Sequence, residues 1–140
     1  MATIERREER MTWYAAHLVE YFKVLEGPQS SFLCYERVIL IEAENEKRAY
    51  EEAERLGRAH AEKERDLDIE ERGHPLRPAK GVFAGVRKLI ECQHVSPETP
   101  SGGPFTRSGT EITYSRFIVD TEEAAQALAK GEAATVLYEE

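Results

Sequence analysis

The pattern of hydrophobic and polar residues along the chain predicts five strands and two helices in the order ββαββαβ. Aromatic and β-branched residues concentrate in the five predicted strands, which cover residues 12–24, 32–43, 81–95, 111–119 and 133–138. The short stretch GPQSS separates the first two strands, so we expect them to form an antiparallel hairpin. We expect a second hairpin between the third and fourth strands, across a loop rich in Pro, Gly and Ser.

The spacing of apolar residues changes to that of a helix after the second strand. Ala49, Ala53 and Leu56 form a thin apolar stripe, and Asn45 is placed to cap the start of this helix. Gly57 indicates either a close approach to a neighbouring element or the start of fraying. In the third strand, Gly85 indicates a bulge or another close approach.

The second helix is expected to start at a cap formed by Asp120 and to stop at Gly131. Without the first strand, the remaining order βαββαβ is that of the ferredoxin-like split arrangement. We therefore predict an α+β fold with a mainly antiparallel sheet and both helices on one face. The place of the extra N-terminal strand in the sheet is left open.

The chain has the length of a single domain. We assign residues 1–140 to one domain that includes three less regular segments. These are a flexible arm at 1–11, a fraying helix and loop at 61–80, and a flexible hairpin loop at 96–110. The middle of the chain is dense in charges of both signs, which is typical of a solvated helix.

Both faces of the first strand are apolar, and the second strand is similar. Residues Tyr14, Ala16, Leu18 and Phe22 point one way in the first strand, and Trp13, Ala15, Val19 and Tyr21 point the other way. Helices on one face would leave the other face uncovered. We predict that a second copy of the chain covers it, sheet against sheet, in a homodimer. The alternative is that segment 61–80 or the N-terminal arm folds over it.

Charge and composition exclude several classes of protein. The 140 residues include 19 Lys and Arg and 27 Asp and Glu, for a net charge of −8. This acidic balance argues against a nucleic-acid partner, which requires a basic face. No apolar run approaches the roughly 18 residues of a membrane span, and the first ten residues lack the apolar region of a signal peptide. We predict an acidic cytoplasmic protein with no membrane partner.

The sequence does not identify an active site. Cys34, Cys92, His17 and His94 offer the residue types of a zinc site, but the short paired spacing of such sites is missing. The glycines of the 96–110 loop lack the Lys-Ser/Thr of a phosphate-binding loop. Cys34 lies inside a strand, a setting for a packed thiol and not for a nucleophile. We therefore predict no metal site, no cofactor and no catalytic residue.

Basic and aromatic residues on the predicted strands suggest one possible pocket. Arg87, Lys88 and Arg116, together with Tyr14 and Tyr114, could surround a small anion. The alternative is that these charges form cross-strand pairs on a solvated face.

Four stretches of the chain resemble a small bacterial family catalogued as a domain of unknown function. They are WYAAHLVEYF at 13–22, YERVILIEAENEKRAYEEAERLG at 35–57, FAGVRKLIEC at 83–92 and GTEITYSRFIVDTEEAAQAL at 109–128. The family is marked by strands with Trp-Tyr-Ala-Ala, Gly-Val-x-Lys-Leu and Thr-Glu-Ile-x-Tyr. The resemblance implies no activity and no catalytic residue. It adds weight to Trp13, Lys88, Glu111 and Tyr114 as polar or aromatic positions to test.

The full set of candidate ligand-binding or partner-binding residues is Trp13, Tyr14, His17, Arg87, Lys88, Glu111, Tyr114 and Arg116. We predict a domain that acts by binding, without enzymatic activity, and that self-associates through its sheet. One alternative is a small-ligand sensor or enzyme of the dimeric α+β barrel type, with a pocket near Lys88, Glu111 and Tyr114. Another is a module for a protein partner, such as a toxin neutraliser whose acidic surface suits a basic target.

Overall fold

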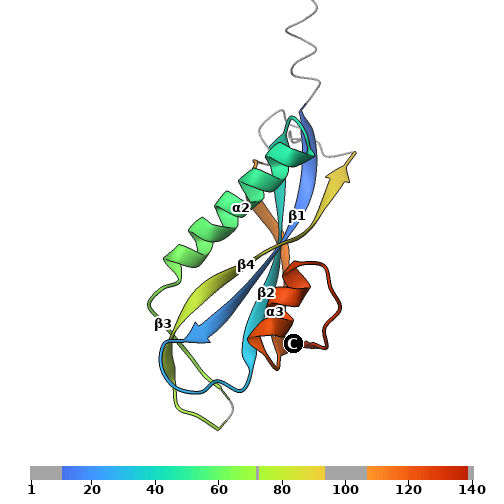
Figure 1. Cartoon of the computed structure of the whole chain (residues 1–140). Helices are drawn as coiled ribbons and strands as arrows, with labels where there is room; N and C mark the ends of the chain where they lie inside the picture. Colours follow the sequence, from blue (N-terminus) through green and yellow to red (C-terminus); the bar gives the residue numbers. More distant parts are fainter. Residues whose placement is uncertain (1–10, 72, 94–106, 139–140) are drawn as a thin grey trace, which may run out of the picture.

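A computed structural model describes residues 11–71, 73–93 and 107–138. Its elements, in chain order, are β1 (Thr12–Val24), β2 (Phe32–Ala43), α2 (Glu46–Lys63), β3 (Leu67–Ile69), β4 (Arg77–Cys92), β5 (Thr110–Val119), α3 (Glu122–Ala129) and β6 (Leu137–Tyr138) (Figure 1). The expected arm at 1–11 lies outside the described residues except for its last residue, as does the expected loop at 96–110 except for 107–110. None of the helices in the described ranges is long and apolar enough to cross a membrane.

The strands form one antiparallel sheet in the order β3-β4-β1-β2-β5-β6. The expected hairpin of β1 and β2 is confirmed, with Thr12 opposite Ala43 and Tyr21 opposite Cys34. The expected hairpin between the third and fourth strands is wrong, because β4 pairs with β1 and β5 pairs with β2. The two strands with two apolar faces take the central places, and β4 and β5 flank them.

The α+β class and the antiparallel sheet are confirmed. Strands β2 and β4 are both antiparallel to β1, so they run parallel to each other with β1 between them. Helix α2 joins them, and together they form a split βαβ unit whose gap is filled by the N-terminal strand. By contrast, α3 joins two antiparallel neighbours, β5 and β6, and so does not make the second crossover expected of a ferredoxin-like order.

The two helices lie on opposite faces of the sheet, not on one face as expected (Figure 1). On β1, Ala16 and Leu18 belong to the core cluster beneath α2, whereas Tyr21 belongs to the cluster beneath α3. Even and odd positions of a strand point to opposite faces. The apolar residues on the two faces of β1 therefore pack largely within the same chain, Ala16 and Leu18 beneath α2, Tyr21 beneath α3, and Trp13 and Ala15 against side chains of the neighbouring strands.

The glycines singled out in the sequence allow close packing. Gly57 of α2 lies against the ring of Phe83 on β4, where an added Cβ would be 2.3 Å from Phe83 Cε1. Gly85 has a φ of +150° and lies against Ala129 of α3, and it is next to a shift in the β1–β4 register. Both expected close approaches are confirmed.

The segment 61–80 is more regular than expected. Helix α2 continues to Lys63, β3 follows, and β4 begins at Arg77. The buried carboxylate of Glu71 ties this region to the β1–β2 turn, where it accepts hydrogen bonds from the backbone N–H of Ser30 and of Ser31, at 2.9 and 3.0 Å. It also forms an ion pair with Arg77. The bonds to Ser30 and Ser31 join residues about 40 positions apart in the chain, so local sequence patterns do not predict them.

One of the two predicted N-terminal helix caps is confirmed and the other is wrong. Asn45 Oδ1 accepts a hydrogen bond from the backbone N–H of Arg48, which confirms the predicted cap of α2. Helix α3 is capped by Thr121 and not by Asp120, since Thr121 Oγ1 accepts from the backbone N–H of Ala124 at 3.1 Å. The expected stop at Gly131 is confirmed by its φ of +81°. The last strand is shorter than the predicted 133–138.

Candidate functional site

A cluster of charged side chains lies between α2 and the sheet. Glu20 is on the face of β1 that carries Ala16 and Leu18, and it therefore points toward α2. His60 is in the last turn of α2, and Glu64 is the residue at its C-terminal cap. Arg37 of β2 and Glu111 of β5 complete the cluster from the neighbouring strands.

Ring and carboxylate atoms of this cluster are in close contact. His60 Nδ1 is 3.0 Å from Glu20 Oε2 and 3.4 Å from Glu64 Oε1. Arg37 Nη2 is 3.4 Å from Glu64 Oε1 and 3.8 Å from Glu20 Oε1, while Arg37 Nη1 donates to Glu111 Oε1 at 3.0 Å. Three carboxylates thus share a single guanidinium, and the cluster carries an excess of negative charge when all three are ionised.

Glu20 is the most deeply buried member of the cluster. It is 3% exposed, inside a strand that is otherwise largely apolar. Glu20 Oε1 and Glu64 Oε2 are buried and have no hydrogen-bond partner among the described residues. A buried polar atom without a partner typically costs about 1–3 kcal/mol, and more when the group is charged. The cluster therefore requires a proton or a cation to be satisfied.

The electrostatics of the cluster favour a proton on Glu20. Burial, followed by the adjacent carboxyl of Glu64, raises the pKa of Glu20 to about 8, and Arg37 only partly opposes this shift. Burial, and then the charge of Arg37, lowers the pKa of His60. At neutral pH the expected state is a protonated Glu20 beside a neutral imidazole, which is the form of histidine that binds metal ions.

A pocket of about 330 Å³ opens beside the cluster. Its lining combines apolar side chains, among them Leu18, Ile39 and Leu56, with the charged or polar side chains of Arg37, His60 and Glu111. The pocket gives a small molecule or water a path from solvent to His60, which is itself 40% exposed at its side chain.

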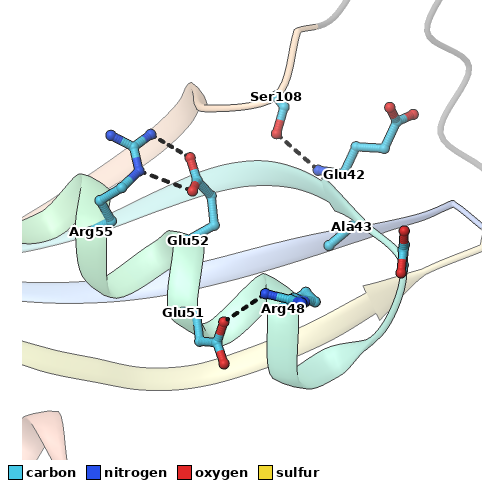
Figure 2. Close-up of a pocket in the computed structure, with 8 residues that line it drawn as sticks. Glu42, Ala43, Arg48, Glu51, Glu52, Arg55 and Ser108 are labelled. Atoms are coloured by element: carbon cyan, nitrogen blue, oxygen red, sulfur yellow. Dashed lines mark hydrogen bonds and ion pairs between the residues drawn. The ribbon is translucent and has the colours of Figure 1, made fainter.

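A larger hollow of about 570 Å³, near the start of α2, offers no comparable chemistry (Figure 2). Its guanidinium groups are already paired with neighbouring carboxylates, Arg48 with Glu51 and Arg55 with Glu52. These four side chains are exposed, and exposed ion pairs contribute little energy. The hollow is a solvated surface of the helix.

Two of the candidate residues predicted from sequence, His17 and Arg87, both contact Glu36, which was not among the candidates. His17 Nδ1 is 2.8 Å from Glu36 Oε2, and Arg87 Nη1 is 2.8 Å from Glu36 Oε1. Burial opposes ionisation of Glu36, but hydrogen bonds from His17 and Arg87 lower its pKa overall. Lys88 lies opposite His17 in the β1–β4 register. This group is on the face of the sheet covered by α3.

The other predicted residues are divided between the two faces. Trp13 shares the α3 face with His17, whereas Tyr14 packs beneath α2. Tyr114, Arg116 and Glu111 of β5 lie opposite β2 residues that face α2, namely Arg37, Tyr35 and Ile39. The five side chains considered for an anion pocket therefore do not gather in one place. Lys88 is likewise separated by the sheet from Glu111 and Tyr114.

Sequence reasoning missed Glu20, Arg37, His60 and Glu64. One signal was present, because Glu20 is the only carboxylate in a strand that is apolar on both faces. A second was the spacing of His60 and Glu64, which places both on one side of a helix. The cluster as a whole needs the β1–β2 register and the position of α2, which no local pattern supplies.

The cysteines do not form the zinc site considered from sequence. Cys34 is fully buried beneath α3, whereas Cys92 packs beside Trp13 in a different cluster. Both thiols are free. Burial raises the pKa of Cys34 to about 12, so it is a neutral packed thiol, as expected. His94, the fourth residue considered, lies outside the described residues.

Comparison with known proteins identifies a family but no activity. A family model described as a domain of unknown function, DUF4288, matches residues 13–100. The matched segment contains β1 through β4, and with them Glu20, Arg37, His60 and Glu64, while Glu111 follows it. It includes the Trp-Tyr-Ala-Ala and Gly-Val-x-Lys-Leu strands but not the 109–128 stretch. No match was found among curated proteins or among solved structures.

Proposed function

On the premise that the chain belongs to the DUF4288 family of domains of unknown function, we propose that it binds a divalent transition-metal ion through Glu20, His60 and Glu64. One observation carries this proposal. The carboxylate of Glu20 is almost fully buried, has an oxygen without a hydrogen-bond partner in the described structure, and lies beside two further ligand groups. The proposed function is thus a binding function, as the sequence suggested, at a different place in the fold.

The spacing of the three ligand groups suits a metal ion. With bonds of about 2.0–2.1 Å in a tetrahedral site, neighbouring ligand atoms lie roughly 3.3 Å apart. The distances from His60 Nδ1 to the two glutamate oxygens are 3.0 and 3.4 Å. One imidazole nitrogen with two carboxylates favours Zn²⁺ or Mn²⁺ over Ca²⁺, which prefers oxygen ligands alone.

Charge balance supports the same proposal. With Glu20 ionised, the three carboxylates of the cluster exceed its one guanidinium, and a divalent ion would offset the difference. The ion and the proton on Glu20 then compete for one site. We therefore expect metal affinity to increase with pH up to about 8, the pKa of Glu20.

Three protein ligands leave room in the coordination sphere for a further group. The adjacent pocket lets water or a small molecule reach that position. This arrangement supports the small-ligand sensor or enzyme that the sequence left as an alternative, with the pocket at His60 and Glu111 and not at Lys88.

The test measures metal binding by the chelator-stripped protein. Calorimetry and thermal unfolding are carried out with Zn²⁺, Mn²⁺ or Mg²⁺. We expect Zn²⁺ or Mn²⁺ to raise the Tm, because an ion at 100 times its Kd stabilises the folded state by about 2.7 kcal/mol. Glu20→Gln and His60→Gln should abolish this rise. Glu62→Gln is the matched control, since Glu62 is an exposed carboxylate on the same helix. No rise in the wild type, or an equal rise in all four proteins, would refute the proposal.

A second candidate function is general acid–base catalysis in the same pocket without a metal. The observation that favours it is the pair formed by Glu20, with a pKa of about 8, and His60, whose pKa is lowered. A thermal-shift screen of small molecules in the presence of chelator tests this candidate. A compound that stabilises the wild type and not Glu20→Gln would support it, and stabilisation of both proteins would argue against it.

We further propose that the domain works in the reducing cytoplasm. The support is that Cys34 and Cys92 are both free thiols, with Cys34 packed in the core. The toxin-neutraliser alternative has no comparable support in the described contacts. Mass spectrometry of the alkylated protein from cell lysate would show both thiols reduced, and a mixed or intramolecular disulfide would contradict this location.

A further inference from the structure

The outer edge of β5 is open along most of its length. β6 pairs only with Phe117 and Ile118, and no other described strand pairs with that side of β5. The seven residues from Thr110 to Arg116 are all exposed. Backbone N–H and C=O groups along such an edge form a template for pairing with another strand.

The side chains on this edge favour a protein partner over solvent. Ile112 is 51% exposed and Tyr114 is 57% exposed. The residues between Glu111 and Arg116 carry no charge and include no proline, so two of the usual features that protect an edge strand are missing here, and the bulge at Ile112 is the protecting feature that this stretch does have. At the opposite edge of the sheet, β3 has only three residues with an exposed Asp68 in the middle, and is protected in this way.

We propose that a second copy of this chain pairs with β5, strand to strand, in an antiparallel homodimer centred on Tyr114. The two sheets then join edge to edge into one continuous sheet. A helix packs on each face of the sheet, so the proposed contact lies at the edge, in place of the sheet-on-sheet packing expected from sequence.

Face alternation and charge select this register. Residues directly opposite each other in an antiparallel pair point to the same face, so the twofold axis passes through a residue and not between two residues. With the axis at Tyr114, the two Tyr114 rings meet, and Thr113 of each copy lies opposite Ser115 of the other. Arg116 then lies opposite the bulge at Ile112, where Glu111 shares the α2 face with it. Centring on Thr113 instead places Glu111 opposite Ser115, without this charge pairing.

The first test is the oligomeric state of the full chain, measured by sedimentation over a micromolar dilution series. We expect a concentration-dependent dimer for the wild type and a monomer for Tyr114→Lys, which brings two ammonium groups together on the twofold axis. Tyr50→Lys is the matched control, because Tyr50 is an exposed tyrosine on α2, and this variant should remain a dimer. A wild type that stays monomeric, or a Tyr114→Lys variant that remains a dimer, would overturn the proposal.

The second test reports the register directly. Tyr114→Cys should form a disulfide between two copies under mild oxidation, since the two substituted positions face each other across the axis. Thr113→Cys should form it far less, and Tyr50→Cys not at all. Stronger crosslinking of Thr113→Cys than of Tyr114→Cys would overturn the Tyr114-centred register. Folding of each variant is checked by far-UV circular dichroism.

Discussion

Gly57 of α2 and Phe83 of β4 are in such close contact that a single added carbon does not fit between them. A Cβ at Gly57 would be 2.3 Å from Phe83 Cε1. Alanine normally stabilises a helix by about 1 kcal/mol relative to glycine. At this position we expect Gly57→Ala to destabilise the protein, because overpacking costs about 1–3 kcal/mol. Urea unfolding measures the change.

A double-mutant cycle separates this clash from any effect on the helix itself. In a Phe83→Ala background the ring is gone, and Gly57→Ala should become neutral or stabilising. An equal loss in both backgrounds would show that the ring is not the cause.

The buried carboxyl of Glu20 should make stability fall with pH in a defined range. Its pKa is about 8 in the folded protein against 4.5 for an unperturbed glutamate. Because the pKa is raised in the folded state, the protonated carboxyl of Glu20 contributes fully to stability below pH 4.5, and this contribution is lost as the pH rises to about 8. Between these values the glutamate is ionised in the unfolded chain and protonated in the folded protein. The free energy of unfolding therefore decreases by up to about 1.4 kcal/mol for each pH unit.

Glu20→Gln cannot ionise and should remove this slope. The measurement is the free energy of unfolding in urea, for wild type and variant, at several pH values in metal-free buffer. Other carboxylates titrate in both proteins, so the difference between the two curves isolates Glu20. Parallel curves across the range would contradict the raised pKa.

Glu71 should be far more important to stability than its neighbour Glu70. Glu71 accepts two backbone hydrogen bonds from the β1–β2 turn and pairs with Arg77, and its replacement leaves these groups without partners. We expect Glu71→Ala to cost about 3–5 kcal/mol, as for the removal of one member of a buried ion pair. Glu70→Ala, at an exposed position, should change stability by less than about 0.5 kcal/mol. Similar Tm values for the two variants would exclude this role.

Tyr21 should control how firmly α3 is held on the sheet. Its hydroxyl donates to Glu122 Oε2 at 2.5 Å, across the interface between β1 and α3. This hydrogen bond is the largest contribution to the lowered pKa of Glu122. In Tyr21→Phe we expect faster hydrogen exchange at the amides of α3, unchanged exchange in α2, and a higher pKa of Glu122. Equal acceleration in both helices would indicate global destabilisation instead.

Local patterns predicted those parts of the fold that depend on neighbouring residues. Runs of aromatic and β-branched residues located β1 and β2, and the spacing of Ala49 and Ala53 located α2. They predicted the pairing of β1 with β2 but not the partners of β4 and β5. The apolar residues on both faces of β1 were correctly read as buried. A second copy was predicted as the cover because both helices were placed on one face, whereas in the structure α3 packs on part of the other face.

The candidate site was not predictable from sequence for a related reason. His60 and Glu20 are 40 positions apart and meet because α2 crosses the face of β1 on which Glu20 lies. The candidates predicted from sequence include Lys88, Tyr114 and Arg116, which are polar or aromatic residues on strands. The face of a strand residue depends on register, and the register of β4 shifts twice against β1. The sequence therefore does not determine which of these side chains share a face.

The central position of β1 also determines the order in which the fold can assemble. During synthesis β1 precedes its partners and can pair with β2 as soon as that strand emerges, but its other edge faces β4, which follows the whole of α2. Until β4 docks, that edge stays unpaired in the nascent chain. Contacts between residues distant in sequence form slowly, so the docking of β4 is the expected rate-limiting step of folding. During that interval the exposed strand is a target for chaperones and a point of vulnerability to misassembly.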